Sequence, residues 1–204
     1  MIYTKTFRFF ISSTFKDFQL ERQRLHERVF PAIDKYLKDN YPQYTFQAID
    51  LRWGVTEEAQ YNQQAINICL NEIETCQKYL KPNFFIMIGN RYGWIPLPYT
   101  IEKDEFREIL SQLNKSERDY LSKWYSIDTN HIPISYILQT RTKNYQDWNI
   151  WEIEEKKIQE ILLKAINKID NKSIDKIKYS TSATELEVYK GIQDYKNQIS
   201  KSNC

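Results

Sequence analysis

The chain has 204 residues, 41% of them apolar, and its 29 basic and 27 acidic side chains leave a net charge of +2. This near-balance excludes a nucleic-acid binder that works by charge alone and a strongly self-repelling disordered chain. Only four glycines accompany 10 Phe, 15 Tyr and 5 Trp, and neither G-x-G-x-x-G nor the P-loop pattern occurs, which disfavours a Rossmann dinucleotide site and a P-loop NTPase.

Strand and helix signals alternate along the first half of the chain. Apolar runs at Phe7–Ile11, Tyr44–Ile49 and Phe84–Ile88 predict three strands, the last of them buried on both faces. Apolar residues at helical spacing predict helices over 14–39 and 62–79 between these strands. One face of the second helix carries Ile66, Cys69, Ile73 and Cys76. This order of elements favours right-handed crossovers and a parallel sheet.

Two helix starts carry capping patterns. Thr14 and Asp17 resemble a capping box at the start of the first helix, and Ser182 and Glu185 form the Ser-x-x-Glu pattern at the start of the last one. The second pattern predicts a helix over 182–199.

The segment after Pro98 mixes helical and strand signals. The patterns predict helices over 102–113, 116–126 and 146–170, a strand over 132–138 and a polar linker over 171–178. On the long helix, Trp151, Ile158 and Ala165 form one seam, with Leu162 and Ile169 beside it. We expect one α/β domain over 1–204, with residues 5–98 as its core and a helical and strand portion over 99–200, from the N-terminal part of a longer protein.

Polar and aromatic residues gather where the three predicted strands end. The segments Ser12–Thr14, Asp50–Gly54 and Gly89–Trp94 each follow a strand. Because ligands of parallel α/β sheets bind beyond the carboxyl ends of the strands, we expect these segments to form a ligand-binding edge.

The second predicted strand is followed by side chains that could bind a ligand, namely Asp50, Arg52 and Trp53. Arg52 can bind a phosphate or carboxylate through two N–H groups, and Trp53 can stack on a base or ring. The alternative is an internal ion pair between Asp50 and Arg52 with a packed indole.

The other two strand ends offer similar groups. Arg91, Tyr92 and Trp94 repeat the combination of a cation and aromatic rings, with internal packing as the alternative role. Ser12 and Ser13 offer hydroxyl and N–H groups that suit an anion at a helix start, although such residues also cap helices. Glu21 and Arg22, by contrast, are interpreted as solvated helix residues, and Glu185 as a member of the late capping box.

Signals for metals, membranes and export are weak. No run of about 18 apolar residues occurs, so we expect no membrane-spanning helix, and the N-terminal segment is interpreted as a strand and not as a signal peptide. Cys69 and Cys76 are predicted to be small buried hydrophobes. Because the chain has only two histidines, we expect no metal site and no resident cofactor. The expected location is cytoplasmic.

Several stretches together resemble a known family. Residues 9–22, 50–58, 69–76 and 84–96 resemble the TIR-like domain of unknown function at the N-terminus of telomerase-associated protein, nephrocystin and NACHT–WD-repeat proteins. Residues 182–192 resemble the late Ser-x-Thr-Glu motif of that family. The resemblance implies a flavodoxin-like, TIR-related three-layer sandwich with a mostly parallel central sheet. It also implies the front module of a STAND-type signalling NTPase.

Two functions follow as hypotheses from this resemblance. The first is a signalling and interaction module whose partners are proteins, namely further copies of itself and the downstream domains. The second is an effector that cleaves the N-glycosidic bond of NAD or a related nucleotide, which would be its ligand. In the second, the strand-end residues bind the nucleotide, and analogy with NAD-cleaving TIR relatives makes Glu185, then Glu187, the catalytic carboxylate. Membrane binding is not expected, and the charge balance argues against nucleic acid.

Overall fold

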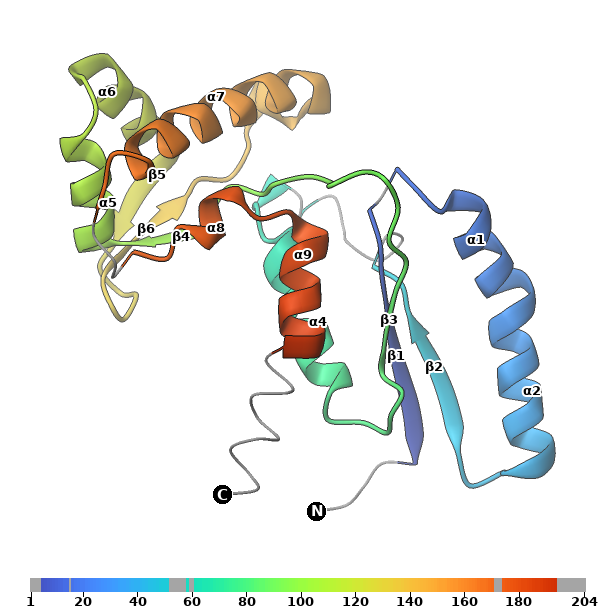
Figure 1. Cartoon of the computed structure of the whole chain (residues 1–204). Helices are drawn as coiled ribbons and strands as arrows, with labels where there is room; N and C mark the ends of the chain where they lie inside the picture. The colour runs from blue at the N-terminus through green and yellow to red at the C-terminus, as the bar shows by residue number, and fades with distance from the viewer. Residues whose placement is uncertain (1–4, 15, 52–57, 59–60, 171–173, 194–204) are drawn as a thin grey trace. The chain divides into compact units, whose positions relative to one another are not determined.

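The structure, a computed structural model, describes residues 5–14, 16–51, 58, 61–170 and 174–193. The chain divides into two compact units (Figure 1). Unit 1 comprises residues 1–55, 66–94 and 182–204, and unit 2 comprises residues 56–65 and 95–181. The single domain expected over 1–204 stays a prediction.

A parallel sheet forms the centre of unit 1. Its strands are β1 (Thr6–Ser12), β2 (Thr45–Ile49) and β3 (Phe84–Ile86), in the order β2-β1-β3. Both pairings are parallel, and Phe10 lies opposite Ile49 on one side and Phe84 on the other. The parallel α/β sheet predicted from the sequence is therefore confirmed.

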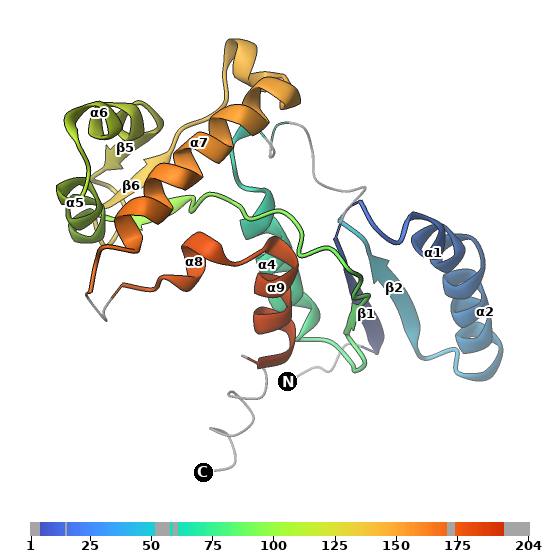
Figure 2. The ribbon, with the colours of Figure 1, turned by 45° about the horizontal axis from the view of Figure 1, so that its top comes forward.

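Helices cover both faces of this sheet (Figure 1). On one face, α1 (Gln19–Arg24) continues through a π-helical turn (Leu25–Val29) into α2 (Phe30–Asn40). On the other face, α4 (Ala65–Cys76) and α9 (Ala183–Val188) lie side by side, as Figures 1 and 2 both show. This layering is that of a flavodoxin-like sandwich.

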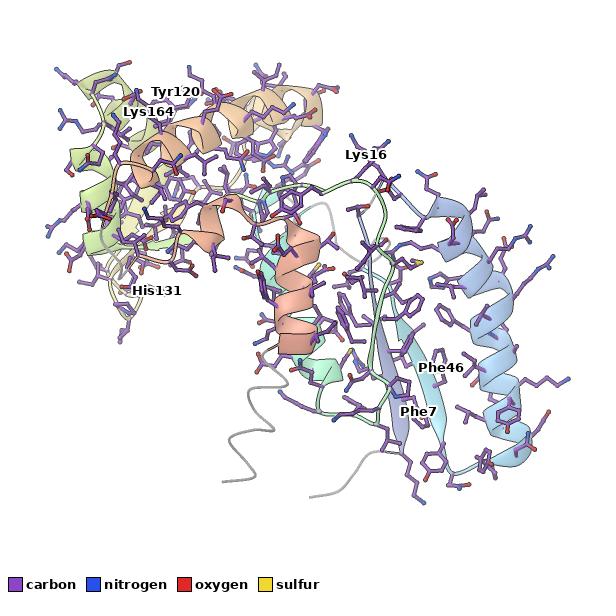
Figure 3. All side chains as sticks on the ribbon, in the orientation of Figure 1. Phe7, Lys16, Phe46, Tyr120, His131 and Lys164 are labelled. Carbon is purple, nitrogen blue, oxygen red and sulfur yellow. The ribbon has the colours of Figure 1, made fainter. Side chains whose placement is uncertain are left out.

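Aromatic rings pack the sheet against its helices. On the α2 face, the Phe46 ring lies 5.5 Å from that of Phe30 and 6.1 Å from that of Phe9, and Figure 3 shows Phe46 in the layer between β2 and α2. On the opposite face, Phe10 stacks on Phe84. The predicted apolar face of α4 packs there, and its buried residues are Ile66, Cys69, Ile73 and Cys76.

The first predicted capping box is wrong. The helix begins at Gln19, and the preceding Phe18 has a left-handed backbone conformation, with φ of 57°. The Thr14 hydroxyl donates to Asp17 Oδ2 at 2.6 Å, so these two side chains stabilise the loop before the helix. A short polar pair can close a turn in this way as readily as it can cap a helix.

The third strand is shorter and more exposed than predicted. It ends at Ile86, and Phe85 and Ile88 are 36% and 79% exposed. The prediction of burial on both faces is wrong because β3 lies at the edge of the described sheet, where the helices cover it incompletely.

Unit 2 has its own antiparallel sheet, with the order β4-β6-β5. The strands are β4 (Thr100–Glu102), β5 (Tyr125–Asp128) and β6 (Ser135–Leu138). The helices are α5 (Lys103–Ser111), α6 (Lys115–Trp124), a 3-10 turn (Lys143–Gln146), α7 (Trp148–Ile166) and α8 (Ile177–Ser180).

Sequence patterns missed part of unit 2. The strands β4 and β5 were not predicted. The strand β4 has only three residues, and β5 follows α6 without a break, so the helix predicted over 116–126 extends into β5. The strand predicted over 132–138 begins only at Ser135, and α8 overlaps the predicted linker.

The long helix of unit 2 packs as predicted. Its seam residues Trp151, Ile158 and Ala165 are buried, and Trp151 makes an edge contact with Trp124 of α6 at 5.1 Å between ring centroids. Phe106 and Leu121 belong to the same apolar cluster. Within the parts of the chain that the structure describes, no helix has the length and apolar character needed to cross a bilayer.

Candidate functional site

A buried hydroxyl–carboxylate contact lies at the carboxyl end of β1. Ser12, the last residue of β1, donates a hydrogen bond to Glu187 Oε2 of α9. Both residues are buried, with 1% and 7% of their surfaces exposed. The structure thus brings together two predicted site residues that lie 175 positions apart in the sequence.

Burial raises the pKa of Glu187 to about 7. Hydrogen bonds from Ser12 and Cys69 and the charge of Arg22 act in the opposite direction, and the charge of Asp50 raises the pKa further. Burial also raises the pKa of the Cys69 thiol, with Glu187 adding to the effect. The thiol therefore stays protonated as a donor to the carboxylate, and Glu187 can exchange a proton near neutral pH.

A buried ion pair lies beside this contact, at the carboxyl end of β2. Arg22 Nη1 of α1 donates to Asp50 Oδ1, and each side chain is only 2% exposed. The same guanidinium donates through Nε and Nη2 to Ser13 Oγ, at 3.0 and 2.8 Å. His26 Nε2 lies 3.1 Å from Asp50 Oδ2. Arg22 therefore joins the ends of β1 and β2 to α1.

The interpretation of Arg22 as a solvated helix residue is wrong, because its side chain is only 2% exposed. A usable signal was present, because Arg22, His26 and Phe30 recur every four residues and so lie on one face of the helical segment. Phe30 is buried against the sheet. Applied backward from Phe30, the same spacing places Arg22 on the sheet side.

Glu185 has a different environment from Glu187, because residues two apart on a helix point to different sides. Its carboxylate accepts hydrogen bonds from the hydroxyls of Tyr92 and Tyr189, the second at 3.2 Å. These bonds raise the pKa of both tyrosines. The carboxylate is only partly buried.

The late capping pattern is half confirmed. Ser182 caps α9, since its Oγ accepts from the Glu185 N–H at 3.3 Å. In a full capping box, the Glu185 side chain would in turn accept from the Ser182 N–H. Here that N–H donates instead to the Tyr92 hydroxyl at 3.3 Å. Tyr92 therefore connects the loop after β3 to the start of α9.

The remaining candidates of the third strand end lie in the loop after β3. Arg91 Nε lies 3.1 Å from Asp17 Oδ1, with 61% of the Arg91 side chain exposed. The Trp94 carbonyl accepts from the Ala183 N–H at 2.8 Å. Gly93 has φ of 95°, and a Cβ there would lie 2.9 Å from Thr14 Cγ2, so this position requires glycine.

Two predicted ligand-binding residues, Arg52 and Trp53, lie outside the described residues. Their roles stay predictions. The alternative predicted for Asp50, an ion pair with Arg52, also stays a prediction, and the ion pair that the structure describes joins Asp50 to Arg22 instead.

These contacts define a strand-end cluster, a name used below for Ser12, Ser13, Arg22, Asp50 and Glu187. Its groups form two hydrogen-bonded sets, Ser12 with Glu187 and Arg22 with Ser13 and Asp50. The charges of Arg22 and Asp50 act on Glu187, whose pKa lies near neutrality. Such groups can hold a proton or stabilise the positions of α1 and α9 on the sheet.

Comparison with known proteins places this fold in a family. The family model described as "Domain of unknown function (DUF4062)" matches residues 8–202. No solved structure matches the chain.

The similar curated proteins are much longer than this chain. The human "NACHT and WD repeat domain-containing protein 2" is 29% identical over 93% of this chain, which spans 12% of that protein. A TPR repeat-containing protein of Dictyostelium discoideum is 32% identical over 71% of the chain and 7% of its own length. Mouse "Telomerase protein component 1" is 37% identical over 48% of the chain and 3% of its own length. The chain thus spans about a tenth or less of these relatives, and it belongs to the DUF4062 family.

Proposed function

We propose that this domain is a signalling and interaction module of a NACHT-type multidomain protein, and that it acts by self-association. Relatives with NACHT and WD-repeat names support this context, as does the small share of each relative that the domain spans. In a long assembling protein, a domain of this kind comes into contact with copies of itself when its neighbours oligomerise, because tethering raises its effective concentration.

The observation that carries this proposal is the internal pairing of the candidate polar groups. Each described one has a partner within unit 1. The pairs are Ser12 with Glu187, Ser13 and Asp50 with Arg22, Arg91 with Asp17, and Tyr92 with Glu185. Groups that are already paired must lose those partners before they bind a substrate, which favours a structural role for the cluster.

Deletion of this domain from its multidomain parent tests the proposal. We expect deletion of residues 1–204 to abolish the output of the assembled protein, and fusion of an unrelated self-associating domain in its place to restore part of that output. Assembly and output that both survive the deletion would end the proposal.

One observation favours a second candidate, an effector that hydrolyses NAD or a related nucleotide. Glu187 is a buried carboxylate with a pKa raised to about 7, as general acid–base catalysts often are, and it lies at the strand ends where α/β folds bind ligands. An oxocarbenium-like transition state at the ribose would be stabilised by such a carboxylate once ionised.

Nucleotide turnover by forcibly oligomerised protein tests this candidate, with NAD and ATP as substrates and chromatography of the products. Glu187→Gln should abolish turnover, and Glu185→Gln, on the same helix, tests the other carboxylate predicted from the sequence and should leave turnover in place. Absence of turnover in the wild-type assembly, or equal activity in the Glu187→Gln variant, removes this candidate.

A further inference from the structure

Unit 1 has an open apolar groove on the side opposite α4 and α9. The groove has a volume of about 440 Å³ and is formed by the α1 segment, the π-helical turn that follows it and the end of β3. It is lined by Leu20, Glu21, Arg24, Leu25, Val29, Phe85 and Met87. Its lining surface is almost entirely apolar, and Leu20 is 72% exposed to solvent.

The groove follows from how the helices cover the sheet. The α2 face is packed over β1 and β2, where Phe30 and Phe9 contact Phe46. The sheet continues to β3, whose Phe85 stacks on Phe9 at 5.8 Å but stays partly exposed. Because the helical segment does not extend over this edge of the described sheet, apolar side chains on both sides remain open to solvent. Contiguous exposed apolar surface of this kind marks interaction sites.

Two opposite charges lie at the groove. Among the described residues of its lining, only Glu21 and Arg24 are charged, and they lie three positions apart on one helix. Arg24 also lies 3.9 Å from Glu27 in an exposed pair, an arrangement that contributes little. A surface with one acid and one base at this spacing is complementary in charge to itself when two copies meet across a two-fold axis.

We infer that a second copy of this chain occupies this groove, with the two α1 helices antiparallel, so that Glu21 of each copy pairs with Arg24 of the other. Leu20 and Val29 of one copy then cover Phe85 and Met87 of the other. This inference rests on the proposed self-association and assigns it to a surface.

The size of the groove sets the expected strength of association. Standard stable interfaces use about 20–30 residues from each partner, whereas seven residues of the described chain line this groove. We therefore expect the isolated chain to associate weakly, with a dissociation constant in the micromolar range, within the concentrations that sedimentation equilibrium covers. Tethering within a larger assembly would convert this weak contact into a stable one.

Sedimentation equilibrium of the 204-residue chain, from micromolar to near-millimolar concentration, tests the inference. The wild type should show reversible dimerisation. Leu20→Glu should weaken it by at least about tenfold, because it introduces a charge into the apolar contact. Ile153→Glu is the matched control, since Ile153 is equally exposed at 73% but lies on α7 of unit 2, and it should leave the dissociation constant unchanged.

Charge reversal then tests the antiparallel geometry. Glu21→Arg and Arg24→Glu should each weaken dimerisation roughly tenfold, because each places two like-charged pairs at the interface. The double variant E21R/R24E should restore the wild-type dissociation constant, since the pairs are exchanged between copies.

The outcomes separate this inference from the proposed function. Wild-type dimers that Leu20→Glu does not weaken would overturn the groove assignment and leave self-association standing. A chain that stays monomeric throughout would overturn both. Dimers weakened by Leu20→Glu but not restored by the double variant would overturn the antiparallel pairing.

Discussion

The strand-end cluster and the apolar groove lie in the same unit and differ in almost every respect. The cluster buries charged groups and pairs them, as in the Arg22–Asp50 contact with 2% of each side chain exposed. The groove exposes apolar groups, including Leu20 at 72%. Residues of α1 and its continuation contribute to both, Arg22 to the first and Leu20 to the second.

The difference shows how one amphipathic helix serves two purposes. Its inward side fixes the ends of β1 and β2 through charged hydrogen bonds, and its edge presents apolar surface where the sheet is incompletely covered. We therefore expect the charged residues of the cluster to stabilise the fold and the exposed apolar residues of the groove to contact a partner. Changes in the cluster should affect stability, and changes in the groove should affect association.

The largest stability effect is expected at Asp50. Asp50→Ala leaves the Arg22 guanidinium buried without its carboxylate, which should lower the free energy of unfolding by about 3–5 kcal/mol. Urea denaturation measures this loss. Asp34→Ala, which removes an exposed pair with Lys38, is the control and should cost no more than about 0.5 kcal/mol. Equal small losses in both variants would show that the buried Arg22–Asp50 pair contributes no more to stability than an exposed ion pair.

Glu187 should make stability depend on pH. Because burial raises its pKa from 4.5 to about 7, the folded state favours the protonated carboxyl. Its stabilisation is therefore complete below pH 4.5 and is lost as the pH rises through about 7. At about 1.4 kcal/mol per pKa unit, the loss is about 3 kcal/mol.

The Glu187→Gln variant isolates this effect. The difference in unfolding free energy between wild type and variant should fall by about 3 kcal/mol as the pH rises from about 4.5 to about 8. Glu185→Gln is the matched carboxylate on the same helix. A pH-independent difference for Glu187→Gln, or an equal pH dependence for both variants, would show that Glu187 is not the buried titrating group.

A smaller loss of stability is expected at the helix cap formed by Ser182. Ser182→Ala removes the acceptor for the Glu185 N–H and should cost about 1 kcal/mol. Ser122→Ala, at an exposed position inside α6, should be neutral or slightly stabilising, because alanine favours helix interiors. Thermal unfolding of both variants measures the difference, and no loss in the Ser182→Ala variant would contradict the capping role.

Sequence patterns located the strand ends but not the partners there. Alternating strand and helix signals predicted the parallel sheet, so Ser12, Asp50 and the loop after β3 could be placed at one edge before any contact was known. Which acid meets which base depends on long-range packing. Asp50 pairs with Arg22 from a helix, and Ser12 with Glu187 from the end of the chain.

The groove could not be predicted for a related reason. The run at Phe84–Ile88 has the apolar pattern of a strand covered on both faces, and only the three-dimensional arrangement leaves Phe85 at an open edge. In unit 2, the short strands β4 and β5 were missed because their pairing partner β6, and not their local sequence, determines their conformation.

A single assay can test directly whether the groove, and not the strand-end cluster, mediates dimerisation. It compares one substitution from each region. Sedimentation equilibrium of the Leu20→Glu and Glu187→Gln variants is measured beside the wild type. We expect Leu20→Glu to abolish or strongly weaken dimerisation and Glu187→Gln to leave it unchanged. Dimerisation lost in Glu187→Gln but kept in Leu20→Glu would contradict this expectation.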